Sequence, residues 1–426
     1  MQHKLLKKTL LAASLSVIIA PTVSFATNGL APTGLGQVHK GMGGAAVGNP
    51  QNTTTMMTNP AAASFIPDGW DVAGELFQPN RTVKSPAWTG AIGGSVYKGD
   101  KASAFFIPEG AFKKNRGKYA LGLAVYGNGG MNTSFPKSPV FPTGNAQQPY
   151  APFNAGTKST TGIDLKQVFI SPTISSQITP NQSVGLSLNM VYQRFHATGL
   201  QAFQGNPKAN PKKLLAFQDP GTSSATGIGA TLGWMGKLND TVTAGASYRF
   251  KTKMGKFKKY EGLFPSGRMD VPAALTVGMS AKVTPKTTVA MDVQKIYYTD
   301  VKAIGNPASS PGRFGDSNGP GFGWDDQVVF KIGMKTQATP KLALMAGYNH
   351  GKSPVGQEDT FFGALTPAVV EDHLSLGFEY GLNKNSSVVG SYTHTFSNTV
   401  EGKIGEQPFD LTMDQDAVGI GYSRTF

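Results

Sequence analysis

Residues 184–192 read VGLSLNMVY, and in this stretch large apolar side chains alternate with small or polar ones, with Val191 as the one exception. Successive side chains of a β-strand point to opposite faces, so a period of two predicts a strand with one apolar and one polar face. The same pattern returns in residues 228–238, 374–382 and 416–426. A soluble β-sandwich alternates in the same way, so the connections between strands must decide the architecture.

Connections of two alternating lengths separate fourteen expected strands. The strands are expected near 70–83, 102–112, 118–128, 165–178, 183–196, 226–237, 241–251, 270–282, 287–299, 326–337, 341–350, 371–382, 386–399 and 416–426. The short connections, at 113–117, 179–181, 239–240, 284–286, 339–340 and 383–385, are rich in the Asn, Asp and Pro of tight turns. Every second connection is long, and this layout is typical of outer-membrane barrels. We therefore predict an all-β fold, with a 14-stranded antiparallel transmembrane β-barrel over residues 69–426.

The first 26 residues predict a cleaved export signal. Three lysines precede an apolar run at 10–20, and Ser24-Phe25-Ala26 places small residues where signal peptidase cleaves. An uncleaved membrane anchor is the alternative, but the apolar run is short for a bilayer and ends at Pro21. An export signal followed by a barrel pattern predicts a location in the bacterial outer membrane.

Residues 27–68 do not have the pattern of a strand. They are dense in Gly, Ala, Asn and Pro, as in Lys40-Gly41-Met42-Gly43-Gly44-Ala45-Ala46. A barrel of fourteen strands is wider than one filled by its own side chains. This segment is therefore expected to lie inside the barrel as a small hatch, or plug.

Composition excludes several classes of function. The chain has 39 basic and 25 acidic residues, a net charge of +14, but the export signal argues against nucleic-acid binding, and no compact Lys/Arg cluster resembles a recognition helix. The absence of cysteine excludes disulfides and thiol chemistry, and the six histidines show no metal-ligand spacing, so no metal or cofactor is expected. The hydrolase candidates, His394 near Ser397 and the run Glu371-Asp372-His373, lack a suitably spaced third partner.

Motifs in the first quarter of the chain carry a family resemblance. Gly34-Leu35-Gly36, the run at 40–45, Asn59-Pro60-Ala61 and ELFQPN at 75–80 resemble the N-terminal hatch and first strand of the FadL/TodX family of outer-membrane transporters of hydrophobic compounds. GLAVYGNGG at 122–130 resembles the third strand of that family. In architecture the resemblance covers the whole mature chain.

The resemblance implies a transport route. Extracellular loops would capture a hydrophobic ligand, usually a long-chain fatty acid, which moves to a pocket near the mature N-terminus, shifts the hatch and leaves sideways at a kink in the third strand. It places Thr27, Asn28 and Gly29 near the pocket, Asn59, Pro60 and Ala61 in the hatch, and Gly127, Asn128, Gly129 and Gly130 at the kink. The glycines could equally end a strand and open a loop.

Two further groups of residues are candidates for ligand contact. The long loops are rich in aromatic residues, among them Phe203 and Phe217, which could form a capture groove or pack into a core of the loops. Arg249 and Lys331 have the inward parity of their strands and could pair with a carboxylate, although Lys331 could also pair with Asp292.

The sequence therefore favours an outer-membrane channel for long-chain fatty acids or similar hydrophobic molecules, working by passive diffusion as a monomer. An aromatic-hydrocarbon transporter on the same fold, a general porin and an outer-membrane enzyme stay as alternatives. The expected partners are hydrophobic small molecules and membrane lipid.

Overall fold

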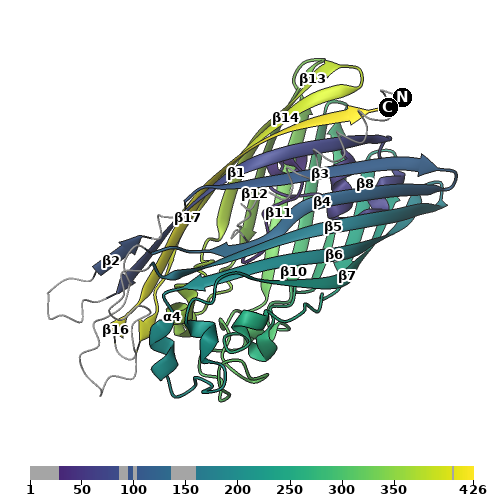
Figure 1. Ribbon diagram of the computed structural model, residues 1–426. Coiled ribbons are helices and arrows are strands. Elements are labelled where there is room, and N and C mark those ends of the chain that lie inside the picture. The colour runs from purple at the N-terminus through teal and green to yellow at the C-terminus, as the bar shows by residue number, and fades with distance from the viewer. Residues whose placement is uncertain (1–27, 86–94, 99–102, 136–159, 405–406) are drawn as a thin grey trace, which may run out of the picture.

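The computed structural model describes residues 28–85, 95–98, 103–135, 160–404 and 407–426, and it forms a closed antiparallel barrel (Figure 1). Neighbouring strands follow one another in chain order, and β1 pairs with β17 from Gly69↔Thr425 to Lys84↔Asp410 to complete the ring. The barrel strands are β1 (Gly69–Ser85), β3 (Phe105–Arg116), β4 (Tyr119–Asn132), β5 (Gly162–Thr179), β6 (Gln182–Thr198), β7 (Ser223–Lys237), β8 (Val242–Arg249), β9 (Ala274–Thr284), β10 (Thr287–Ile296), β11 (Gln327–Gln337), β12 (Leu342–Gly351), β13 (Asp372–Asn383), β14 (Ser386–Val400) and β17 (Asp410–Thr425).

The predicted barrel of fourteen strands is thus confirmed over the described residues. Short additional strands lie at one end: β2 (Ser95–Lys98) pairs with the end of β1, and β15 (Lys403–Ile404) pairs with β16 (Gln407–Pro408). Within the described ranges, no helix is both long enough and apolar enough to cross a membrane.

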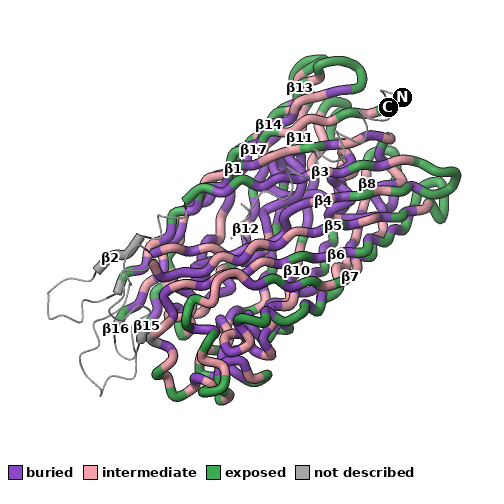
Figure 2. The backbone as a smooth tube through the Cα atoms, in the orientation of Figure 1, coloured by how far each residue is buried: buried purple, intermediate pink, exposed green. Residues whose placement is uncertain are grey.

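Apolar side chains cover the outside of the barrel, and small or polar ones face inward. Leu186, Leu188 and Tyr192 of β6 are exposed, whereas Ser187 and Asn189 between them are buried. Figure 2 shows the same alternation of buried and exposed positions along the strands. An apolar exterior around a polar interior is the arrangement that lipid imposes on a barrel.

The two ends of the barrel differ in the length of their connections. Short turns such as 117–118, 180–181 and 285–286 lie at one end, which in barrels of this kind is periplasmic. The long connections lie at the other, extracellular end and contain 3-10 helices and short α-helices. They are η4 (Gln201–Gly205), η5 (Leu214–Phe217), η6 (Lys258–Tyr260), η7 (Pro265–Gly267), α3 (Lys302–Gly305), η8 (Gln357–Asp359) and α4 (Thr360–Gly363).

Several strand boundaries differ from the predicted ones, and β17 shows why. It begins at Asp410 instead of 416, because its first part has the opposite pattern: Leu411 and Met413 face inward and are buried, while Asp414 and Asp416 face outward. The outward face becomes apolar at Val418. The strand therefore extends beyond the lipid-facing band, where apolar-out alternation no longer identifies it. Likewise β3 continues through Arg116, which shortens the predicted turn at 113–117 to two residues.

Residues 28–68, which we call the hatch segment, lie inside the barrel. The segment contains α2 (Gln37–Gly41), η1 (Thr53–Met57) and η2 (Pro60–Ser64); α2 packs on β13 and β14, and η2 packs on β5, β6 and β7. Inward-facing glycines let the two backbones meet: a Cβ on Gly347 would lie 2.1 Å from the Gly43 nitrogen. The hatch segment therefore fits closely against the wall on several sides.

Candidate functional site: the hatch segment, the interrupted strand and two cavities

Two opposed charges on neighbouring strands hold the hatch segment from one side. Asp292 of β10 lies directly opposite Lys331 of β11 in the strand register. One Asp292 oxygen accepts hydrogen bonds from the backbone N–H groups of Ala46 (2.7 Å) and Val47 (3.0 Å). Lys331 Nζ donates to the backbone oxygen of Thr33 at 3.1 Å. Both charges thus bind hatch backbone, and Lys331 lines neither of the two cavities described below.

An ion pair fixes α2 to the opposite wall. Buried Lys40 Nζ lies 2.8 Å from a carboxylate oxygen of Glu75 on β1 and 4.0 Å from Glu109 on β3. Glu109 also accepts hydrogen bonds from the Gly36 N–H (3.1 Å) and from Gln37 Nε2 (2.8 Å). Lys40, Glu75 and Gly36 lie in the motifs quoted above, but their contacts were not anticipated, since the partners are 35 to 73 positions apart in the chain.

The Asn-Pro-Ala motif links the hatch segment to β5, β6 and β7. Asn59 Oδ1 accepts the Ala61 N–H at the start of η2, and Asn59 Nδ2 donates to the backbone oxygens of Val47 (2.8 Å) and Trp234 (2.9 Å). Pro60 occupies the first turn of η2, where its missing N–H costs nothing. The Ala61 carbonyl accepts hydrogen bonds from Ser175 and Ser183.

The beginning of the hatch segment folds around the hydroxyl of Tyr298. That hydroxyl accepts the Leu30 N–H at 2.9 Å and donates to the backbone oxygen of Asn28. Gly29 lies between them with φ +62°, a value that favours glycine. Thr27 lies outside the described residues. Tyr298 follows β10 and was not anticipated, because no local sequence signal reveals its partner.

Strand β4 is interrupted at the glycine-rich stretch. Its register with β5 shifts between Gly127↔Val168 and Gly130↔Lys166, which leaves one extra residue on β4. Gly129 has φ +110°, a conformation that side chains rarely adopt, and the Asn128 carbonyl accepts a hydrogen bond from the Gln167 side chain.

Pairing between β3 and β4 ends at the same level. The last pair is Glu109↔Tyr126, and the β3 residues beyond it, 105–108, pair only with β1. The first of these unpaired positions is Pro108, which has no N–H to donate to a ladder. The wall is therefore not hydrogen-bonded between β3 and β4 above Tyr126, and Glu109, which holds α2, lies at its edge.

A small inner cavity, partly open to solvent, lies beside this interruption. Arg249 of β8 reaches it; its Nη2 donates to Pro272 O at 3.4 Å, and its buried Nε has no partner among the described residues. Asp270 also lines the cavity, but one of its oxygens already accepts the Met254 N–H. The lining comprises Leu30, Ala31, Asn128, Gly129, Gly130, Leu165, Gln167, Gln193, Arg249, Met269, Asp270, Val271, Pro272 and Tyr298.

A second, apolar cavity lies among the extracellular loops. Phe203 lines it, whereas Phe217 stacks behind Phe203 with ring centroids 6.2 Å apart and does not line it. This small cavity is partly open to solvent, and its walls are Ile163, Phe195, Leu200, Phe203, Leu263, Phe264, Ala303, Phe314, Pro320, Gly321, Phe322, Phe362 and Leu365. The loop aromatics thus pack with one another and also border a cavity.

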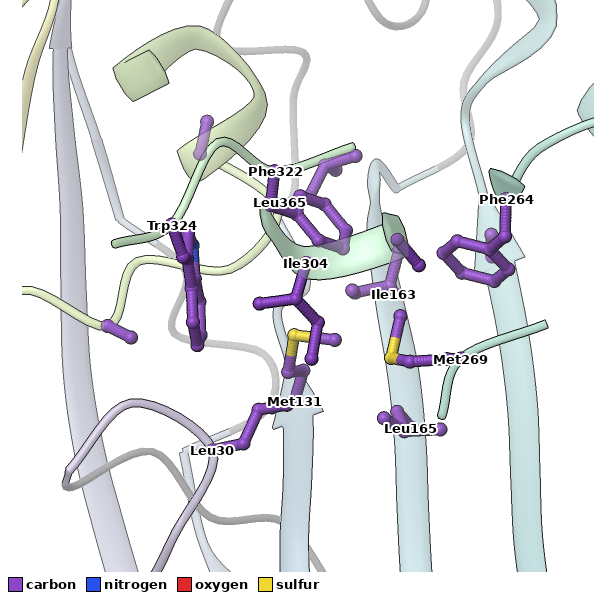
Figure 3. Packing of buried hydrophobic residues seen from close by; sticks show 14 of the residues in the cluster. Leu30, Met131, Ile163, Leu165, Phe264, Met269, Ile304, Phe322, Trp324 and Leu365 are labelled. Carbon is purple, nitrogen blue, oxygen red and sulfur yellow. The ribbon is translucent and has the colours of Figure 1, made fainter. Parts of the chain in front are cut away.

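One apolar cluster joins the two cavities. Phe264, Phe322 and Leu365 at the outer cavity belong to the same set of buried contacts as Leu30 and Met269 at the inner one. Figure 3 shows these side chains together with Met131, Ile163 and Leu165 between the loop end and the start of the hatch segment. The walls of the two cavities are therefore connected by one continuous cluster of apolar side chains. Among the described residues, no group of His, Asp and Glu side chains is arranged to hold a metal ion.

These features define an outer-membrane β-barrel channel with an obstructed lumen, an apolar outer cavity and an inner cavity of mixed polarity. A model of the family described as outer membrane protein transport protein (OMPP1/FadL/TodX) matches residues 13–426. The chain belongs to this family, and it is a transport channel of the bacterial outer membrane for hydrophobic compounds, not an enzyme. No curated protein matches the sequence.

Solved structures of family members share the fold. The Pseudomonas putida toluene transporter TodX is 18% identical, with a TM-score of 0.67 over 92% of this chain and 99% of that one. The Ralstonia pickettii toluene transporter TbuX is 19% identical, with a TM-score of 0.62 over 92% and 99%. A Pseudomonas aeruginosa FadL homologue is 13% identical, with a TM-score of 0.64 over 96% and 100%.

Proposed function

We propose that this channel takes up long-chain fatty acids or similar hydrophobic carboxylic acids by passive diffusion. The observation that carries this proposal is Arg249, whose guanidinium reaches the inner cavity with a buried N–H that has no partner among the described residues. A carboxylate would supply the missing acceptor and form charge-assisted hydrogen bonds. A buried donor without an acceptor is costly, which favours a ligand that pairs with it.

The route begins in the extracellular loops. The apolar cavity around Phe203 captures the alkyl chain, because burying apolar surface is favourable. The chain then follows the shared apolar cluster to the inner cavity, where Leu30 and Tyr298 bring the start of the hatch segment into contact with the ligand. Movement of that segment makes room for the ligand, and Asn59, Pro60 and Ala61 keep the rest of the hatch segment on the wall.

The exit is lateral, between β3 and β4. Residues 128–130 of the glycine-rich stretch line the inner cavity and belong to the part of β4 that β3 does not pair with. A ligand leaving there enters the membrane without crossing the polar hatch contacts. β1 and β17 pair from Gly69 to Lys84, so one chain closes the ring by itself, as expected for a monomer.

Aromatic hydrocarbons are the second candidate ligands. The outer cavity is lined by apolar side chains and the glycine backbone, so it would accept an uncharged ring as well as an alkyl chain. Two of the structural neighbours are toluene transporters. For such a ligand Arg249 would be dispensable. The close fit of the hatch segment argues against a general polar porin.

The substitution Arg249→Gln in vesicles tests the proposal. Uptake of labelled oleate should fall about tenfold, as expected for losing a charge-assisted hydrogen bond, while uptake of methyl oleate and of toluene stays unchanged. Arg116→Gln, at an exposed periplasmic turn, is the matched control. Equal uptake of oleate by wild type and Arg249→Gln would rule out the carboxylate role and favour the hydrocarbon ligand.

A further inference from the structure

Five lysines lie within nine residues of one extracellular loop, with no acidic residue among them: Lys251, Lys253, Lys256, Lys258 and Lys259. We call this set the lysine strip. All five side chains are exposed, while Met254 and Phe257 between them are buried.

Buried aromatic residues hold this loop in place. The Phe257 ring packs 5.5 Å from Phe195 of β6, and Tyr260, directly after the strip, lies 4.7 Å from the same ring. The Tyr260 hydroxyl also accepts the Ala197 N–H at 3.0 Å and donates to the backbone oxygen of Gly221. The ammonium groups are therefore attached to a fixed segment.

The strip begins at the outer edge of the lipid-facing band. Its first residues run alongside β7, with hydrogen bonds from Phe250 N to Ala230 O (3.0 Å) and from Gly255 N to Thr226 O (2.8 Å). Thr226 pairs with Tyr192, the last large apolar side chain on the outer face of β6 before Arg194. This is the level at which lipid tails give way to headgroups, since aromatic residues mark that boundary in barrels.

Most of this charge is not neutralised by the protein. Lys251 donates to a backbone oxygen, Asp300 O, and Lys256 lies 3.7 Å from Glu261. For Lys253, Lys258 and Lys259 the described residues supply neither an ion pair nor a side-chain hydrogen bond.

The outward carboxylates on β13 and β17 differ from the lysine strip, because the protein itself supplies their hydrogen-bond partners. There the outward carboxylates of Asp372, Asp414 and Asp416 all accept hydrogen bonds from side chains of neighbouring strands, among them His350, Asn80 and His394. The outer rim thus has a basic sector around β7 and β8 that is available to an external anion.

We propose that the lysine strip binds the phosphate groups of an outer-leaflet glycolipid and so anchors this side of the barrel in the membrane. Phosphate is the anion that lies at this level of a bilayer, and basic clusters beside a membrane-spanning segment recognise anionic lipid headgroups. The several point charges of a lysine cluster suit phosphates that differ in position. This inference is independent of the transported ligand.

The purified full-length protein in neutral detergent micelles can be titrated with bisphosphorylated lipid A and with the same lipid after removal of both phosphates. The test variant is Lys253→Gln/Lys258→Gln/Lys259→Gln. The control is Lys286→Gln/Lys341→Gln/Lys384→Gln, which removes the same charge at exposed positions of the periplasmic turns. Barrel closure is checked for each protein by its gel mobility without heating.

Wild type and control should bind the phosphorylated lipid with the same Kd, and the strip variant at least about tenfold more weakly, with the difference shrinking in high salt. Equal affinity of wild type for the two lipids, or equal affinity of the strip variant and the control, would overturn the proposal. Loss of oleate capture by the strip variant with unchanged lipid binding would overturn it too, and would assign the strip to the transported anion.

Discussion

The hydroxyl of Tyr298, at the end of β10, accepts the backbone N–H of Leu30 at 2.9 Å and thereby holds the start of the hatch segment at the inner cavity. The same hydroxyl donates to the Asn28 carbonyl, and its ring packs edge-on against Trp324 at 5.3 Å. One buried side chain thus joins the hatch segment, the inner cavity and the extracellular loop core. The proposed movement of the hatch segment therefore depends on how strongly Tyr298 binds Leu30.

Replacing Tyr298 with Phe keeps the ring and removes these two hydrogen bonds and a longer third one, from the Ala31 N–H at 3.4 Å. The Leu30 N–H and the Asn28 carbonyl lose a partner, a change that costs about 1–3 kcal/mol when such groups stay buried. We expect faster hydrogen exchange in a peptide covering residues 28–35, measured by mass spectrometry on the folded protein. Tyr380→Phe, at an exposed position on the outer face of β13, is the control and should leave that peptide unchanged. Unchanged exchange in Tyr298→Phe would show that the hydroxyl does not hold the segment.

Arg249 and Lys331, the two cations considered for ligand contact, should respond differently to substitution. Lys331 binds the Thr33 carbonyl of the hatch segment, so Lys331→Met should loosen that segment and change uptake of oleate and methyl oleate by the same factor. Arg249→Gln should change oleate uptake alone. Paired uptake assays in vesicles measure both ratios. A Lys331→Met defect confined to oleate would instead place the ligand carboxylate at Lys331.

Acid should weaken the packing of the hatch segment through His39. This residue is fully buried, with Nε2 bonded to Asn49 O at 3.1 Å, and burial lowers its pKa from 6.5 to about 4. A group with a depressed folded-state pKa destabilises the fold on acidification. The free energy of unfolding has its full contribution from neutral His39 above pH 6.5. This contribution falls progressively towards pH 4, by roughly 3 kcal/mol in all.

Limited proteolysis of the hatch segment across this pH range measures the effect. Cleavage should increase between pH 6.5 and 4 in wild type, and His39→Gln should remove most of that increase. The same pH dependence in wild type and His39→Gln would show that protonation of His39 does not loosen the segment.

Prediction from sequence succeeded where one local rule governs a residue's environment. The strands in the lipid-facing band were predictable because lipid demands an apolar outer face at every second position. The start of β17 was missed because its outer face meets water, so Asp414 and Asp416 point outward there.

Long-range partners were beyond local reasoning. The glycines at 127–130 indicated a weak point in β4. The sequence did not show that β3 stops pairing with β4 from Pro108 onward, because that depends on the register of β1, β3 and β4. Lys331 was considered for a ligand and an Asp292 ion pair, whereas the structure gives both residues to the hatch backbone. Such contacts join residues hundreds of positions apart, and composition does not reveal them.

Deletion of Gly129 tests whether the ligand leaves through the wall beside β4. The β4–β5 register carries one extra residue between Gly127 and Gly130, so removing one residue lets β4 continue as a regular strand alongside β5. Uptake of labelled oleate into vesicles is measured for wild type and for the deletion, with barrel closure checked by gel mobility and oleate binding checked in detergent. The deletion variant should fold, bind oleate and lose uptake; uptake at the wild-type rate would show that the ligand does not leave beside β4.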